Sequence, residues 1–286
     1  MEKENVKELK KEIKEIKKEY KDKKLIINKK AKEDLEENKY DYKLKKMNLK
    51  KPLKSEKNKI KIEKRKTNKM KNEPPKRSLL EELGSAITHG IGALIGVLFL
   101  FLMLIKSNDS WRVIVSIVYG LCFFLQMLFS CLYHSFKRES TVKRIFRRFD
   151  YLSIYLQIGG TFAPIYLVYM QEKMWGYPTG LIFFIIQWAF IILGITLVSV
   201  FGPGRNRWIH FTLYFCIGWS GLIFLPFMIE NDLNLFLWIL GGGLAYTIGM
   251  IPFAAFKKTA GAHFIWHFFV LLGAILQFIG IYFYIL

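Results

Sequence analysis

The chain has 286 residues, of which 52% are hydrophobic and 16% aromatic, yet its formal net charge is +20. The two properties belong to different parts, because residues 1–80 hold 30 Lys and Arg against 15 Asp and Glu, and the rest hold 13 against 8. Residues 81–286 are too apolar to form a water-soluble domain of this size. The chain has three cysteines, and all of them lie in apolar segments, which excludes a disulfide framework: Cys122, Cys131 and Cys216.

Residues 1–77 are predicted to form a Lys-rich cytoplasmic tail. A short amphipathic helix is predicted at residues 3–20, from apolar side chains spaced three and four apart: Val6, Leu9, Ile13, Ile16 and Tyr20. From residue 28 the segment is rich in Lys, Glu and Asn, which favours disorder. Anionic lipid headgroups are an expected partner of such a basic segment. Nucleic acid is not expected, because no aromatic side chains alternate with the cations.

Residues 78–286 are predicted to form an all-α membrane domain with seven transmembrane helices, because seven apolar stretches approach the roughly 20 residues that a spanning helix needs. Ser78-Leu-Leu-Glu81 is a capping box that predicts a helix start just before the first span. Gly241-Gly242-Gly243 and Pro252 weaken the sixth span as a helix. The predicted spans are residues 85–105, 112–133, 150–170, 178–200, 208–229, 234–253 and 263–285.

The orientation of these spans follows from the positions of the cations. The loops after the second, fourth and sixth spans carry ten Lys and Arg residues, including Lys257 and Lys258, whereas the opposite loops carry three. This asymmetry predicts a multi-pass protein of the cell (inner or plasma) membrane, with a cytoplasmic N-terminal tail and the C-terminus outside.

Polar residues gather where the second, third and seventh spans meet the predicted cytoplasmic face. Ser130 and His134 end the second span, Asp150 begins the third, and His263 and His267 begin the seventh. Residues four apart share a helix face, so three helices present these groups at one depth. Three imidazoles, a carboxylate and a hydroxyl are the parts of a metal site that holds and activates a water molecule.

Each of these residues also has a simpler interpretation. The histidines can face lipid headgroups, Asp150 can cap the third helix at its N-terminus, and Ser130 can hydrogen-bond to a carbonyl of its own helix. Because all five residues converge on one depth, and because ionisable side chains within a membrane usually mark functional sites, a metal centre is the interpretation that we develop.

Four stretches of the sequence resemble the hemolysin III family, bacterial members of the progestin and adipoQ receptor superfamily, which is related to alkaline ceramidases. The stretches are Glu82-Leu-Gly-Ser85-Ala-Ile-Thr88-His89 in the first span, Ser130-Cys-Leu-Tyr133-His134 in the second, Asp150-Tyr151 through Thr161 in the third, and His263-Phe-Ile-Trp266-His267 in the seventh. Family members often have His where this chain has Tyr151 and Asn where it has Ser85. The long basic tail has no counterpart in the short bacterial members.

The resemblance implies seven transmembrane helices and a zinc ion bound by His134, His263 and His267. It further implies that Asp150 contacts the bound water and that Ser130 completes the site. Seven more residues of these stretches are candidates to support the ligands or to contact a substrate: Glu82, Ser85, Thr88, His89, Tyr133, Tyr151 and Thr161. For His89, packing between helices is the alternative.

The predicted function is zinc-dependent hydrolysis of an amide or ester bond in a membrane lipid, with Asp150 as general base and Ser130 as the group that orients the water or donates to an oxyanion. Ceramide-like amides are the substrate class that the resemblance suggests. Two alternatives stay open. One is a cytolytic or channel-like membrane protein, and the other is a receptor or membrane-stress sensor with a structural zinc.

Overall fold

A computed structural model describes residues 2–27, 32–173, 178–205, 207–255 and 261–286. The chain divides into two units, Met1–Lys71 and Asn72–Leu286. Among the described residues the secondary structure is helical and contains no strand, which confirms the predicted all-α class.

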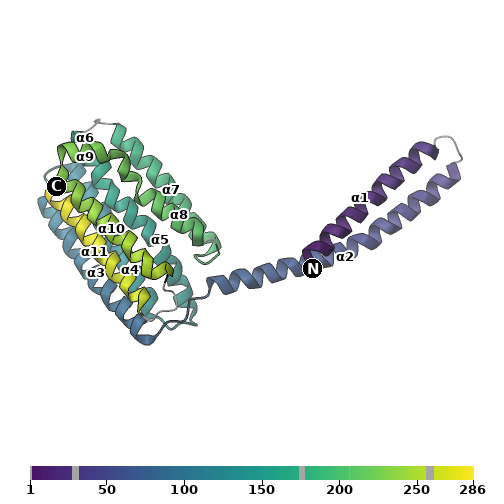
Figure 1. Cartoon of the computed structure of the whole chain (residues 1–286), viewed down its shortest axis with the longest axis horizontal. Helices are drawn as coiled ribbons and strands as arrows, with labels where there is room; N and C mark the ends of the chain where they lie inside the picture. Colours follow the sequence, from purple (N-terminus) through teal and green to yellow (C-terminus); the bar gives the residue numbers. More distant parts are fainter. Residues whose placement is uncertain (1, 28–31, 174–177, 206, 256–260) are drawn as a thin grey trace. The chain divides into compact units, whose positions relative to one another are not determined.

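The first unit consists of α1 (Glu2–Ile27) and nearly all of α2 (Lys32–Asn72). The two helices pair through one side of each, and Tyr20 stacks on Tyr42 with ring centroids 4.4 Å apart (Figure 1). On α1 the half-buried positions are the apolar residues spaced three and four apart: Val6, Leu9, Ile13, Ile16 and Tyr20.

The sequence predicted mostly disorder after residue 28, whereas the structure has the long helix α2 there. Lys and Glu are good helix formers, and ion pairs one turn apart add support, such as Lys45–Asp41 at 3.4 Å. Low hydrophobicity shows that a segment cannot build a core of its own. It does not oppose helix formation in a segment that pairs with a neighbouring helix through a narrow apolar stripe.

Among its described residues, the second unit has seven helical segments long and apolar enough to cross a membrane, as predicted. Large apolar side chains such as Leu94, Phe101 and Ile192 are exposed on their outer faces, which suits lipid rather than water. The segments are α3 (Leu79–Lys106), α4 (Ser110–Ser135), α5 (Thr141–Pro164) continued by η1 (Ile165–Tyr169) and α6 (Met170–Lys173), α7 (Thr179–Phe201), α8 (Arg207–Gly218) continued by η2 (Ser220–Phe224) and α9 (Leu225–Asn231), α10 (Leu233–Ala255), and α11 (Ala262–Tyr284).

The third span starts earlier than predicted, at Thr141 rather than at residue 150. Ser140 caps this helix, because its hydroxyl accepts a hydrogen bond from the Lys143 backbone N–H at 3.1 Å. The sequence interpretation assigned Lys143 and Arg147 to a loop because they are charged, but both are buried side chains of α5. Lys257 and Lys258, which contributed to the predicted orientation, lie outside the described residues, and the orientation stays a prediction.

The bundle brings four helix ends together. α5 is the most buried span, and it packs between α4 and α7, while α11 packs between α10 and α3. Successive helices alternate in direction, so the start of α3, the end of α4 and the starts of α5 and α11 lie at the same end of the unit (Figure 1). All the polar residues singled out in the sequence belong to these four helices.

Two glycines allow α10 and α11 to approach closely. A Cβ atom added at Gly242 would lie 2.7 Å from the carbonyl oxygen of Gly273, whereas one added at Gly241 would meet only Leu276 at 3.8 Å. We therefore expect Gly242→Ala to lower the stability by about 1–3 kcal/mol through overpacking. Gly241→Ala is expected to be neutral or slightly stabilising, since alanine favours helix.

Thermal unfolding of both variants in one detergent measures this difference. A lower Tm for Gly242→Ala alone is the expected result. Equal Tm values for the two variants would show that this close approach of α10 and α11 does not constrain the bundle.

Candidate metal centre

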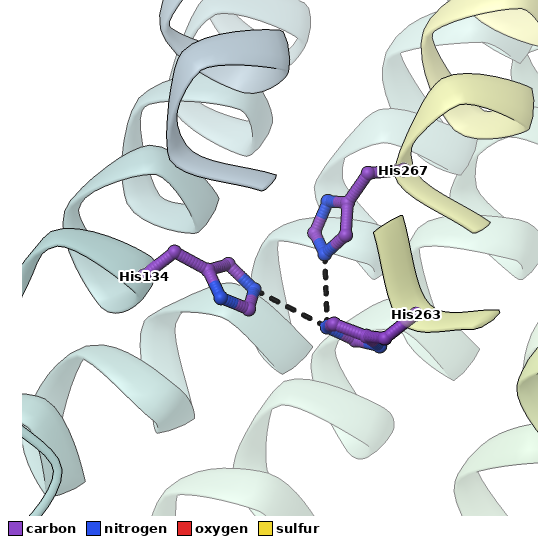
Figure 2. Close-up of side chains that lie close together, drawn as sticks. All are labelled: His134, His263 and His267. Atoms are coloured by element: carbon purple, nitrogen blue, oxygen red, sulfur yellow. Dashed lines mark hydrogen bonds between the residues drawn. The ribbon is translucent and has the colours of Figure 1, made fainter. Parts of the chain in front are cut away.

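Three imidazoles point toward one another at the shared end of α4 and α11 (Figure 2). The Nε2 atoms of His134 and His263 lie 3.3 Å apart, and those of His263 and His267 lie 3.0 Å apart. Taken together, the three side chains offer one nitrogen each within 4.8 Å of one another, which is a group that could hold a metal ion. His134 and His267 are buried and His263 is half-buried.

The first turn of α11 is held by a carboxylate from α3. Glu81 Oε1 accepts hydrogen bonds from the backbone N–H groups of Gly261 at 3.1 Å and His263 at 3.4 Å. A carboxylate at a helix N-terminus satisfies free N–H groups and is favoured by the helix dipole. One of the two hydrogen bonds of the predicted capping box is present, because Ser78 Oγ accepts from the Glu81 backbone N–H. The Glu81 side chain caps α11 instead of its own helix. Glu81 thereby fixes the position of His263.

His134 is oriented by a partly buried ion pair. Its Nδ1 donates to Glu82 Oε2 at 2.6 Å, and Glu82 Oε1 accepts from Lys143 Nζ at 2.9 Å. Lys143 is 1% exposed and lies over the ring of Tyr133, 5.0 Å from its centroid. A carboxylate on one imidazole nitrogen fixes the tautomer that leaves the other nitrogen as a ligand. The chain Lys143–Glu82–His134 therefore directs His134 Nε2 toward the other two histidines.

His267 has a second imidazole beside it. His267 Nδ1 lies 3.0 Å from His89 Nε2, and His89 Nε2 lies 3.3 Å from the carbonyl oxygen of His267. His89 is 1% exposed, and its ring meets that of His267 edge to face with centroids 4.2 Å apart. This contact occupies the ring nitrogen of His267 that faces away from His263, so that His89 from α3 orients a candidate ligand on α11.

Two of the three histidines, His263 and His267, line a cavity of about 160 Å³, whose wall also includes Ser130 and Asp150. Ser130 Oγ is fully buried, and within the described part of the chain it makes no hydrogen bond to a carbonyl of its own helix. Asp150 is not the cap of the third helix, which is Ser140. Both simpler interpretations of these two residues were wrong, and the structure brings their side chains to a space that adjoins the imidazoles.

The other predicted residues divide into two groups. Tyr133, Tyr151 and Thr161 line the cavity with His89. Ser85 and Thr88 were expected to support the ligands or to contact a substrate, but neither lines the cavity. Thr88 Oγ1 donates to the Gly84 carbonyl at 2.7 Å, and Ser85 is buried with no partner for its hydroxyl among the described residues.

Four residues of this end were not predicted: Glu81, Lys143, Arg77 and Arg147. Arg77 and Arg147 line the cavity. Arg147 is 7% exposed, and its Nη1 donates to the Glu73 carbonyl at 3.0 Å. The sequence contained one signal for the buried cations. Lys143 and Arg147 are four residues apart and so share a face of a helix that begins at Thr141.

Breaking the Lys143–Glu82 pair should weaken metal binding. In Lys143→Met, Glu82 has no cation beside it, and its carboxylate no longer holds His134 in one orientation. We expect the metal affinity to fall about 10- to 100-fold, the usual effect of losing a group that orients a ligand. Lys143→Arg should keep most of the affinity, and the exposed Lys137→Met is the matched control.

Competition with a metal-binding dye, on protein in detergent, measures these affinities. Wild-type affinity in Lys143→Met, in a variant that unfolds at the normal temperature, would contradict the role given to the pair.

Comparison with known proteins identifies the family of this chain. A family model described as "Haemolysin-III related" matches residues 77–278. Hemolysin-3 of Bacillus cereus is 34% identical over 210 residues, covering 72% of this chain and 92% of that protein. A hemolysin-3 homolog of Bacillus subtilis (strain 168) is 30% identical over 211 residues, covering 72% of this chain and 95% of that protein. With its seven apolar helices, the chain therefore belongs to the hemolysin III family of membrane proteins.

Proposed function

We propose that the protein is a zinc-dependent hydrolase that cleaves an amide or ester bond of a membrane lipid. The observation that carries this proposal is the group of three imidazoles, two of which line a cavity whose wall also bears a hydroxyl and a carboxylate. Ceramide-like amides are the class that the family resemblance suggests.

The donor set fits zinc. Zinc–imidazole bonds of about 2.0–2.1 Å in a tetrahedral site separate two ligand nitrogens by roughly 3.3–3.4 Å, close to the 3.0 and 3.3 Å between the Nε2 atoms. Zinc held by three protein ligands keeps an open position and makes a water molecule nucleophilic near neutral pH. A structural zinc has four protein ligands, whereas the described residues bring three together here. This difference favours a catalytic metal over a receptor or sensor with a structural one.

The residues on the cavity wall would divide the remaining work. Asp150 is the carboxylate that can take a proton from the attacking water and deliver it to the leaving group. The Ser130 hydroxyl, which is fully buried on the same wall, can donate to the oxygen that gains charge as the carbonyl is attacked. Apolar side chains such as Ile158, Phe162 and Val270 line the same cavity and suit an acyl chain.

The proposed reaction takes place at the cytoplasmic surface, given the orientation that the cations favour. Membrane lipids are then the substrates, and anionic headgroups of the same surface are the proposed partners of the basic first unit.

The test is turnover by the detergent-purified protein of fluorescent lipid amides and esters, before and after chelation and re-addition of zinc. We expect hydrolysis that is lost on chelation and restored by zinc. A protein that binds stoichiometric zinc but cleaves no lipid amide or ester would overturn the proposal and favour the cytolytic or sensor alternatives.

A further inference from the structure

The helix α2 carries two apolar stripes on opposite sides, whereas the described part of α1 carries one. Successive residues of a helix are turned by about 100°, so the place of each side chain around α2 follows from the sequence. The first stripe occupies an arc of about 40°, and its residues are half-buried where α2 pairs with α1: Tyr42, Leu49, Leu53 and Ile60. The apolar residues of α1 from Val6 to Tyr20 are half-buried in the same way.

The second stripe of α2, which we call the outer stripe, lies on the side away from the first and is exposed. Its residues fall within an arc of about 60°: Tyr40, Leu44, Met47 and Ile62. Tyr40 is 69% exposed and Met47 is 50% exposed. Among the described residues of the first unit, pairing with α1 therefore leaves this apolar face uncovered. Such a face marks a surface that a partner covers.

Lysines surround the outer stripe. Residues 39–62 hold ten lysines against two acidic residues, whereas residues 2–24 in α1 hold ten lysines against seven acidic residues. Lys43 and Lys54 are exposed and lie within about 60° of Tyr40 around the helix. The face of α2 that bears the outer stripe is thus both apolar and positively charged, and a partner that matches it is both apolar and negatively charged.

The surface of an anionic bilayer meets both requirements, because its headgroups are negative and apolar chains lie directly beneath them. Amphipathic helices with lysines beside an apolar face bind in this layer, and each lysine near it adds attraction. A second copy of α2 would offer an apolar stripe but would bring ten lysines against ten. The chain joins α2 to the first span through residues 73–78, which extend over at most about 25 Å. A membrane surface is therefore within reach of the first unit without a separate encounter.

We propose that the outer stripe of α2 inserts into the headgroup region of an anionic membrane surface, with the neighbouring lysines bound to lipid phosphates. The first unit then lies on the membrane through α2, and the more nearly neutral α1 faces water. This rests on the partnership with anionic headgroups proposed above, to which it adds the face of α2 that binds and the insertion of its apolar side chains. It is independent of the proposed hydrolysis.

An environment-sensitive dye on the outer stripe measures insertion. Full-length protein receives one new cysteine, as Met47→Cys or as Lys45→Cys. Lys45 is also exposed but lies about 160° from Met47 around the helix, so it is the matched control. The native cysteines are replaced by alanine: Cys122, Cys131 and Cys216. Protein that retains Cys122, which is buried, serves if full replacement proves unstable.

The labelled protein is reconstituted into vesicles of phosphatidylcholine alone or of phosphatidylcholine mixed with phosphatidylglycerol. Both kinds of vesicle are also prepared with brominated acyl chains, which quench a dye that enters the bilayer. The quenched fraction gives the equilibrium between inserted and free α2. Protein without a new cysteine gives the background signal.

We expect the dye of Met47→Cys to be quenched in the mixed vesicles, with an insertion equilibrium about tenfold higher than in phosphatidylcholine, or more, since several lysines contribute. High salt should lower it. The dye of Lys45→Cys should remain in water in both kinds of vesicle. Leu44→Ser, added to Met47→Cys, keeps every charge and should also lower insertion, because it removes apolar contact with the bilayer.

The contribution of the lysines is measured by further substitutions in the Met47→Cys protein. Lys43→Gln together with Lys54→Gln should lower the insertion equilibrium in mixed vesicles about tenfold. Lys10→Gln together with Lys14→Gln removes the same charge from exposed positions of α1 and should leave the equilibrium nearly unchanged. An equal loss in the two double variants would contradict binding through α2.

Three other outcomes would overturn the inference. One is a dye that stays in water at both positions in the mixed vesicles. Another is an equal response at the two positions, which would show attraction without insertion and would leave the partnership with anionic headgroups in place. The third is a change at position 47 that grows with protein density in phosphatidylcholine alone, which would assign the stripe to a second copy. Hydrolysis is measured in the same vesicles, so lipid cleavage without insertion, or insertion without cleavage, separates this inference from the proposed function.

Discussion

Replacing Asp150 with Asn should lower lipid hydrolysis by about 10²- to 10⁴-fold, the usual contribution of a general base. The side chain lines the cavity next to the imidazoles but is not one of the three candidate ligands. Asparagine has nearly the same size and cannot take up the proton from the attacking water. We therefore expect the variant to retain metal and to bind lipid normally while its kcat falls.

Turnover and zinc content are measured on the same purified sample. Glu139→Gln is the matched control, because Glu139 is an exposed carboxylate in the loop between α4 and α5. Near-normal turnover in Asp150→Asn would remove Asp150 from the reaction. A large loss of zinc in this variant would instead make Asp150 a metal ligand.

Alanine in place of any one of the three histidines should nearly abolish metal binding. Zinc sites with four protein ligands bind with about 10–16 kcal/mol, so one ligand contributes roughly 3 kcal/mol, or about a hundredfold in Kd. His134→Ala and His267→Ala should both show this loss, because each provides a buried nitrogen within reach of His263.

His210→Ala is the control for these variants. His210 is also fully buried, but it lies in α8, where its Nδ1 is 2.9 Å from the Tyr155 hydroxyl, and it does not belong to the metal group. It should bind zinc with wild-type affinity. Equal loss of zinc in His210→Ala and His267→Ala would indicate general damage to the fold rather than the removal of a ligand.

The seven spans and the meeting of the histidines could be predicted from the sequence. A spanning helix needs a long apolar run, and alternating helix direction then determines which helix ends meet. The i, i+4 spacing of His263 and His267 places both on one face of α11. Topology and helix periodicity were sufficient for this part of the site.

The contacts that orient the ligands could not be predicted from local patterns. Lys143 meets Glu82 across 61 positions of the sequence, and a charge in a basic segment carries no sign that it will be buried. Thr88 and His89 are adjacent, but successive residues point about 100° apart around a helix. The rotation of α3, which packing against α4 and α11 determines, brings His89 to His267 and leaves Thr88 bonded to its own helix.

X-ray absorption at the zinc edge of the purified wild-type protein tests the central claim most directly, because it reports the ligands of the bound metal. We expect stoichiometric zinc with three imidazole nitrogens and one further light-atom ligand at about 2.0–2.1 Å, the pattern of an open catalytic site. Absence of zinc after chelator-free purification, or four protein ligands including sulfur from a cysteine, would contradict a catalytic centre formed by His134, His263 and His267.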